Sequence, residues 1–175
     1  MRTFGLMLAA LLAAALLSAC STGPGPLGNA GDGMFTECTP APPGQTVTMG
    51  IWWLHNDGTS PVTIQSIHLD EHDLRMTMPW LVPIYHNPKN GQFDEVGAGY
   101  PYPPAFNVAA RWSWARRQPA VGALIRPSKS LNLVFGMTRT SAATGRAGGP
   151  VIVYSAGGTT YTLAEKTAET LVTNC

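Results

Sequence analysis

The residues best suited to recognise a ligand gather in residues 100–117, where aromatic side chains are interspersed with prolines and arginines. Aromatic rings supply rigid apolar area and guanidinium groups supply planar donors, a combination that suits a sugar ring, a peptide or a partner protein. In the alternative interpretation the tryptophans cover an open end of the fold and the arginines are solvated; stacking of arginine on tryptophan fits both. The predicted binding surface comprises Tyr100, Tyr102, Arg111, Trp112, Trp114, Arg116 and Arg117.

Histidine and methionine side chains raise the question of copper, because imidazole and thioether groups are suitable ligands for it. His68 and His72 would lie about 13 Å apart in an extended chain, too far to share one ion. Met76 and Met78 follow the same alternation as Leu74, which predicts that they pack in the core. A blue-copper site would also need a cysteine ligand, and the cysteines other than Cys20 are better explained as a disulfide pair. We therefore expect no metal and no cofactor. The candidates considered are His55, His68, His72, Met76, Met78 and His86.

Nucleophilic catalysis needs a base and an orienting acid within reach of the nucleophile. Serine, histidine and aspartate are all present, but no serine lies in a GxSxG elbow. The acidic clusters at residues 70–73 and 94–95 are more simply explained as polar ends of loops. We therefore expect no catalytic residue and no enzyme. A hydrolase stays open as an alternative, because spacing alone does not exclude paired carboxylates.

The N-terminus has the features of an export leader: Arg2, an apolar run over residues 6–17, and the small residue Ala19 before Cys20. This run is shorter than the roughly 20 residues that a membrane-spanning helix needs. The order Leu17-Ser18-Ala19-Cys20 resembles the lipobox of bacterial lipoproteins, whose cysteine sulfur receives a diacylglycerol and then becomes residue one. The resemblance implies that Cys20 is lipidated and that the protein is held by this lipid on the extracytoplasmic face of the cell membrane. An ordinary secretory leader and a short membrane helix are the alternatives.

With Cys20 assigned to lipid, Cys38 and Cys175 remain as an even pair in a compartment where disulfides persist. We predict that they are joined, with two free thiols as the alternative. The disulfide would close a loop of more than about 100 residues, for which the chain-entropy model gives a stabilisation of about 4–5 kcal/mol.

The charge balance points to no highly charged partner. Removal of residues 1–19 from the 175 leaves 156 residues and takes away only Arg2, so 10 basic and 10 acidic side chains remain. This neutrality gives no indication of nucleic acid or of an anionic membrane surface as a partner.

The domain boundaries follow from composition. Residues 21–33 are rich in glycine and proline and show no apolar periodicity, so we expect a flexible tether of about 20 Å. We predict a signal peptide over 1–19, the lipidated cysteine with its tether over 20–36, and one domain over 37–175.

Alternation with period two dominates the predicted domain and indicates β-strands. The stretches 47–53 and 62–69 are expected to form a hairpin, with a bulge at Ser66 where the alternation slips. Within 86–119 only 106–108 has a strand-like pattern. We also expect a short strand or helix in this stretch, but the sequence does not show where it lies. Residues 165–175 are expected to form a helical turn and a strand over 171–173. Further strands are predicted over 74–84, 131–137, 151–154 and 160–163.

These short strands, with turn signals between them, predict an all-β fold: an antiparallel immunoglobulin-like β-sandwich of about seven strands. A Greek-key sandwich of the cupredoxin type is the rival fold. The tail over 151–163 resembles the closing hairpin of small exported actinobacterial lipoproteins with a domain of uncharacterised function.

The sequence therefore predicts a lipid-anchored extracytoplasmic binding or accessory domain of the cell envelope. Its expected partners are the membrane, through the N-terminal lipid, and an envelope protein or glycan; nucleic acid is not expected. The first alternative is a copper- or other metal-handling lipoprotein, and the second is an envelope hydrolase.

Overall fold

The computed structural model describes residues 24–29, 36–99, 101–140 and 144–175. The predicted leader and Cys20 lie outside these residues, as does Tyr100. In the described part of the chain, no helix has both the length and the apolar character needed to cross a membrane.

The first layer of the fold is a six-stranded sheet built around its two longest strands, β3 (Thr46–Asn56) and β12 (Ser130–Arg139). They pair antiparallel along almost their whole length, as the alternation of apolar residues in both segments predicts. The shorter strands are β1 (Leu27–Asn29) beside β3, β6 (Leu74–Met76) and β7 (Trp80–Pro83) beside β12, and β10 (Gln118–Pro119) beside β7.

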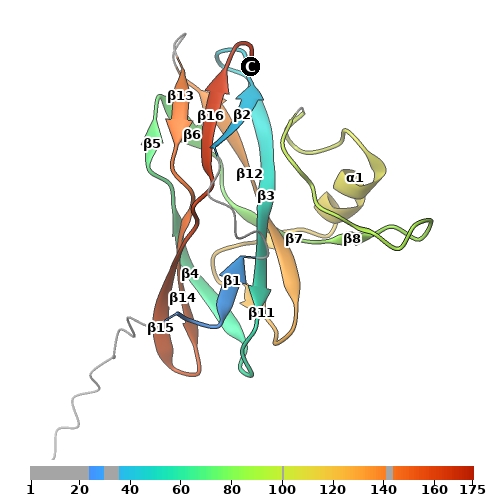
Figure 1. Cartoon of the computed structure of the whole chain (residues 1–175), viewed down its shortest axis with the longest axis vertical. Helices are drawn as coiled ribbons and strands as arrows, with labels where there is room; N and C mark the ends of the chain where they lie inside the picture. The colour runs from blue at the N-terminus through green and yellow to red at the C-terminus, as the bar shows by residue number, and fades with distance from the viewer. Residues whose placement is uncertain (1–23, 30–35, 100, 141–143) are drawn as a thin grey trace, which may run out of the picture.

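The second layer consists of two four-stranded sheets that follow each other along the long axis (Figure 1). One contains β11 (Leu124–Ile125), β4 (Val62–His68), β14 (Val151–Ala156) and β15 (Thr159–Ala164). The other contains β5 (Glu71–His72), β13 (Gly145–Ala147), β16 (Ala168–Val172) and β2 (Thr36–Pro40).

Three strands run in the same order in both sheets, because β4 continues into β5, β13 into β14 and β15 into β16; the fourth strand is β11 beside β4 in one sheet and β2 beside β16 in the other. β6 and β7 are likewise two pieces that both pair with β12. Joined in this way, the framework has seven strands: β2, β3, β4–β5, β6–β7, β12, β13–β14 and β15–β16. The predicted immunoglobulin-like β-sandwich is confirmed. One pair, β2 with β16, is parallel rather than antiparallel.

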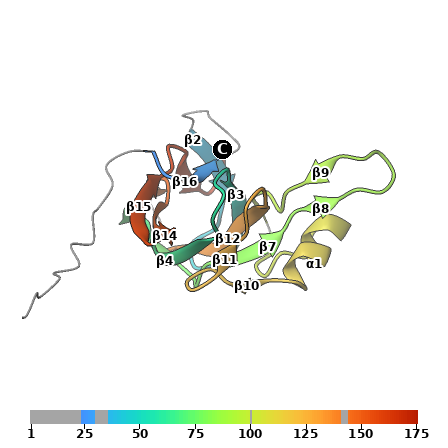
Figure 2. The ribbon, with the colours of Figure 1, turned by 90° about the horizontal axis from the view of Figure 1, so that it is seen from below.

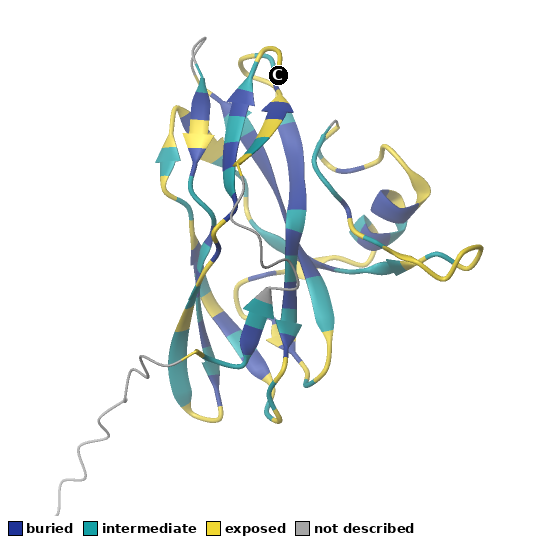
Figure 3. Ribbon diagram, viewed as in Figure 1, coloured by how far each residue is buried: buried dark blue, intermediate teal, exposed yellow. Residues whose placement is uncertain are grey.

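The core fills the space between the layers, where both inner faces are buried (Figure 3). Trp52 of β3 and Phe135 of β12 stack with their ring centroids 5.1 Å apart, and Tyr154 of β14 is fully buried. Burial of such a side chain contributes about 1.5–3 kcal/mol. The sandwich is therefore a rigid support for whatever its loops carry.

The predicted hairpin between the first two strands is wrong. β3 belongs to the first layer and β4 to the second, so the turn after Asn56 carries the chain from one layer to the other. The predicted bulge at Ser66 is confirmed, because the register between β4 and β14 shifts there. Alternation shows that a segment is a strand, but it does not show which sheet the strand joins.

The ends of the domain are fastened together as predicted. Cys38 in β2 and Cys175 form a disulfide with their Cα atoms 6.0 Å apart. The helical turn expected before the last strand is absent, and β16 begins at Ala168, earlier than the predicted strand.

The flexible tether expected over 20–36 does not hold for Leu27–Asn29. These residues form β1 and pair with Leu54–Asn56 of β3. The Leu27 side chain is buried in the core, and its backbone N–H donates to the Tyr154 hydroxyl at 3.2 Å. The segment is docked by its pairing with β3 and by one buried apolar side chain, although its sequence has no apolar periodicity.

A lobe, residues 85–99 and 101–117, projects from the side of the first layer (Figures 1 and 2). It contains a hairpin of β8 (Tyr85–His86) and β9 (Phe93–Asp94) and one helix, α1 (Val108–Trp114). The strand-like pattern predicted over 106–108 is wrong, because Asn107 caps α1: its side chain accepts from the Ala110 N–H at 2.7 Å. A small buried cluster of Val82, Val96, Ala110 and Val134 joins the lobe to the sheet.

Candidate functional site

The predicted aromatic surface is used mainly to attach the lobe. Trp114 packs edge-on against Trp80 of β7 at 5.8 Å and against Tyr102 at 5.6 Å. Trp112 packs against Tyr85 of β8 at 5.4 Å. Each tryptophan of α1 thus contacts a ring on a neighbouring segment, which favours the structural interpretation of this pair.

The arginines of this stretch are exposed but stack on the same rings. The Arg116 guanidinium lies 4.3 Å from the Trp112 ring centroid, and that of Arg117 lies 4.6 Å from Trp114 and 5.0 Å from Trp80. Arg111 donates to the Ala105 carbonyl at 3.2 Å. These guanidinium groups are therefore already partnered within the lobe.

A hollow of about 900 Å³ lies on another side of the lobe, between the β8–β9 hairpin, the start of α1 and β3. We call it the lobe hollow. It combines rings, amides and charged groups: Trp53, Tyr85, Asn87, Lys89, Phe93, Asp94, Glu95, Asn107, Val108 and Ala109.

A second hollow of about 620 Å³ adjoins it and shares Trp53 and Phe93 with it. We call it the strand-end hollow, because it lies where β7 ends and β12 begins. Its lining is Trp53, Pro83, Ile84, Phe93, Gln118, Leu124, Ile125, Arg126, Ser128, Lys129, Ser130 and Leu131.

Trp53 reaches both hollows because β3 contains a bulge. An unbroken alternation would put residues 47, 49, 51 and 53 on one face of the strand, but the register against β12 shifts between Met49 and Trp52, so that Trp52 points inward and Trp53 outward. Asn132 holds the bulge, because its side-chain amide donates to the carbonyls of Gly50 at 2.9 Å and Trp52 at 3.0 Å.

The same asparagine docks the lobe. The Asn132 Oδ1 accepts from the Val96 N–H at 2.9 Å, and the Gly97 N–H donates to the Gly50 carbonyl at 3.0 Å. A Cβ on Gly50 would lie 2.9 Å from the Val96 Cβ, so only glycine permits this close approach. One buried residue thus positions Trp53 and the lobe together.

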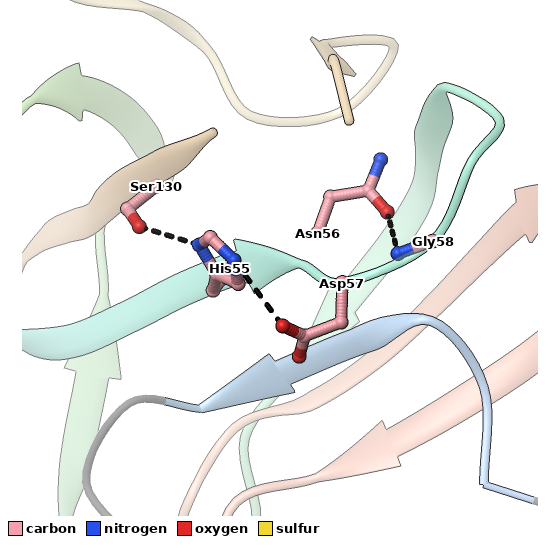
Figure 4. Close-up of polar contacts among 5 residues, drawn as sticks. All are labelled: His55, Asn56, Asp57, Gly58 and Ser130. Carbon is pink, nitrogen blue, oxygen red and sulfur yellow. Dashed lines mark hydrogen bonds and ion pairs between the residues drawn. The ribbon is translucent and has the colours of Figure 1, made fainter. Parts of the chain in front are cut away.

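Ser130, His55 and Asp57 form a hydrogen-bonded row at the edge of the strand-end hollow (Figure 4). Ser130 and His55 are directly opposite each other on β12 and β3, with Ser130 Oγ 2.7 Å from His55 Nδ1. The other ring nitrogen, Nε2, lies 3.2 Å from Asp57 Oδ1. Gly28 leaves room beside the Asp57 carboxylate. A serine, a histidine and an acid are therefore in contact, although no sequence motif indicates it.

Within the described residues, no group of three or more histidine, cysteine, aspartate or glutamate side chains could hold a metal ion. His68 lies at the end of β4 and bonds to Ser66, whereas His72 lies in β5 and contacts Asp70. Met76 packs against the core as predicted, but Met78 is 54% exposed, because the strand breaks between β6 and β7. The His86 ring contacts the Phe93 ring at an interplanar angle of 46°, with centroids 5.0 Å apart.

Three glutamates have raised pKa values; Glu95 lines the lobe hollow, and only Glu169 is fully buried. Burial, together with the charge of Glu37, raises the pKa of Glu95, which lines the hollow. Burial raises the pKa of Glu37 as well. Burial and the charge of Glu37 raise the pKa of Glu169 to about 8. These three acids therefore hold protons more readily than free glutamates.

The sequence analysis missed the residues of the lobe hollow, although one signal was available. Asn90-Gly91 lies between two short aromatic segments, a pattern typical of a hairpin turn, and Gly91 has the positive φ of +70° that favours glycine. That pattern could have located Tyr85 and Phe93 on one hairpin. No comparable signal marks Trp53, whose orientation depends on the bulge.

No protein-family model matches this sequence, and no curated protein matches it. Among solved structures, 98% of the chain is similar to 95% of the ASH/PapD-like domain 7 of human CEP192, with 13% identity and a TM-score of 0.42. A family 123 glycoside hydrolase from Clostridium perfringens is similar over 78% of this chain and 23% of its own, with 11% identity and a TM-score of 0.38.

Proposed function

We propose that the protein is a lipid-anchored binding domain of a bacterial cell envelope, held at the extracytoplasmic face by a lipid on Cys20, and that the lobe hollow is its binding site. The lipobox and leader support the anchor. The observation that carries the binding role is the lobe hollow, a concave site built by a projecting lobe on a rigid sandwich.

The chemistry of the hollow favours a glycan over a protein ligand. Trp53, Tyr85 and Phe93 offer ring faces, and Phe93 is 64% exposed, so its ring is available for stacking. Asn87, Asn107 and Asp94 place amide and carboxylate groups among these rings. Sugar rings have apolar faces and a rim of hydroxyl groups, and this mixture of side chains matches both.

Sedimentation of the purified protein with insoluble cell-wall glycan tests this site. Phe93→Ala removes an exposed ring without opening the core, so we expect unchanged melting and a loss of glycan affinity of roughly tenfold, about 1.4 kcal/mol. Phe106→Ala, a matched change in an exposed ring of the lobe that lies outside both hollows, should keep full affinity. Equal binding by both variants, or none by the unaltered protein, would rule out the glycan site.

Hydrolysis of an ester is a second candidate function, favoured by the contact of Ser130 with His55. With hydrogen on Nε2, His55 donates to Asp57 and accepts the Ser130 hydroxyl proton at Nδ1. Ser130 Oγ would then attack the ester carbonyl carbon, and the proton would pass to the leaving alcohol. Water, activated by the same histidine, would release the acid and restore the serine.

This candidate is tested by hydrolysis of p-nitrophenyl butyrate. Ser130→Ala should reduce the rate to the background rate, because no nucleophile remains. Ser128→Ala, a change of the same type in the same hollow, should leave the rate unchanged. Activity that survives in Ser130→Ala would exclude this assignment.

A further inference from the structure

The strand-end hollow differs from the lobe hollow in its charge. Its lining contains two cations, Arg126 and Lys129, and no aspartate or glutamate. Both cations are exposed, and neither side chain has an ion-pair or hydrogen-bond partner among the described residues. A ligand with an anionic group would therefore supply the partner that these two cations do not have.

Apart from the cations, Gln118, Ser128 and Ser130, the lining of the hollow is apolar. Leu124 is 49% exposed there and Phe93 is 64% exposed, so the surface offers unburied hydrocarbon beside the charges. The apolar lining consists of Trp53, Pro83, Ile84, Phe93, Leu124, Ile125 and Leu131. A ligand that fits must carry a negative group next to a hydrocarbon segment, which describes an anionic amphiphile.

The position of the hollow indicates where such a ligand would come from. Ser130 in its lining is opposite His55, and His55 is opposite Gly28 of β1, so these three residues lie side by side on three adjacent strands. Two strand spacings separate Gly28 from Ser130 by about 10 Å. The hollow therefore lies close to the strand through which the chain leads back to Cys20.

The length of chain before β1 places this end near the membrane. Gly28 is eight residues after Cys20, a stretch that spans at most about 26–29 Å when fully extended. β1, β11 and the turn between β14 and β15 all lie at this end of the molecule, opposite the C-terminus (Figure 1). Docking of β1 thus fixes the end of the sandwich that an anchored protein turns toward the bilayer.

We infer that the strand-end hollow binds an anionic phospholipid of the membrane to which the protein is anchored, with Arg126 and Lys129 at the phosphate and Leu124 against the hydrocarbon. The inference rests on the proposed anchoring at Cys20 for the source of the lipid. It gives the domain a fixed orientation, in which the strand-end hollow faces the lipid and the lobe hollow remains open to the side.

Native mass spectrometry of the full chain in nonionic detergent tests the inference by titration with dioleoylphosphatidylglycerol and dioleoylphosphatidylcholine. We expect one phosphatidylglycerol to bind at least about tenfold more tightly than phosphatidylcholine, since each cation near an anionic lipid contributes roughly fivefold. The double variant Arg126→Glu/Lys129→Glu should lose this preference. Arg146→Glu/Lys166→Glu, with the same charge change on two exposed residues outside the hollow, should retain it.

Three results would overturn the assignment: equal affinity for both lipids, an unchanged preference in the Arg126/Lys129 variant with normal melting, or displacement of the lipid by glycerol 3-phosphate at comparable concentration. The titration does not depend on the state of Cys20. A chain without acyl groups that still selects phosphatidylglycerol would contradict the anchor but support the hollow. An acylated chain without selectivity would contradict only the hollow.

Discussion

Glu169 is the clearest case in which one residue couples stability to pH. Its side chain is 1% exposed in β16, and its pKa is raised to about 8 by burial and by the charge of Glu37. In the unfolded chain the group ionises near pH 4.5. Between these values the folded protein binds more protons than the unfolded chain, so the free energy of unfolding falls as pH rises.

Glu169→Gln removes this ionisation while preserving the shape of the side chain. We expect the variant to be more stable than the unaltered protein at pH 8, and the pH-dependent part of this difference to disappear below pH 4.5, where Glu169 is protonated in both the folded protein and the unfolded chain. The fall in the free energy of unfolding with rising pH should become smaller by up to about 1.4 kcal/mol per pH unit. Urea unfolding followed by tryptophan fluorescence at several pH values measures it.

Asp70→Asn is the control for this change, because the Asp70 side chain is 86% exposed. It should keep the pH dependence of the unaltered protein. A Glu169→Gln variant whose stability differs from that of the unaltered protein by the same amount at every pH would contradict the raised pKa of Glu169.

Among the elements, the framework strands could be identified from period-two alternation, because every second side chain of a strand faces the core and is apolar. This held for β12, for the β14–β15 hairpin and for the bulge in β4. It failed in the lobe, where strands of two residues, such as β8 and β9, are too short to show a period. The sheet that a strand joins is likewise decided by long-range packing, which explains the error at β3 and β4.

The docking of the lobe depends on Asn132, and a substitution there tests that element. Asn132→Leu keeps the volume but leaves the Val96 N–H without its buried acceptor and removes the side-chain donor from the carbonyls of Gly50 and Trp52. We expect the free energy of unfolding to fall by about 2–4 kcal/mol. The Trp53 environment should change as well, because the bulge is no longer held.

Amide hydrogen exchange across the lobe measures this effect more directly than global melting. Protection should fall at Val96 and Gly97 in Asn132→Leu, whereas Asn90→Leu in the exposed turn of the β8–β9 hairpin should leave it unchanged. Full protection at Val96 in the Asn132 variant would mean that the small cluster around Val82 and Ala110 is sufficient to dock the lobe.

For the whole molecule, β1 changes how the domain is expected to sit on its anchor. The composition of residues 21–33 suggested a long flexible tether, but the strand pairing of Leu27–Asn29 shortens it and fixes one end of the sandwich next to the attachment point. Composition could not show this, because the docking depends on a single buried leucine and a free edge of β3. The disulfide, by contrast, could be predicted from the sequence, because the assignment of Cys20 to lipid leaves Cys38 and Cys175 as the remaining pair.

The same contrast applies to the candidate sites. The aromatic and arginine-rich stretch was conspicuous in the sequence, yet its rings mostly hold α1 against β7 and β8. The lobe hollow draws on residues from four separate segments and the strand-end hollow on five, and only the tertiary fold brings these together.

The account depends most on acylation of Cys20, and the mass of the N-terminal peptide from protein extracted with membranes measures it directly. We predict a peptide that begins at Cys20 and carries a diacylglycerol on its sulfur. A peptide that contains unmodified Cys20, or one that continues upstream through Ala19, would contradict the anchor.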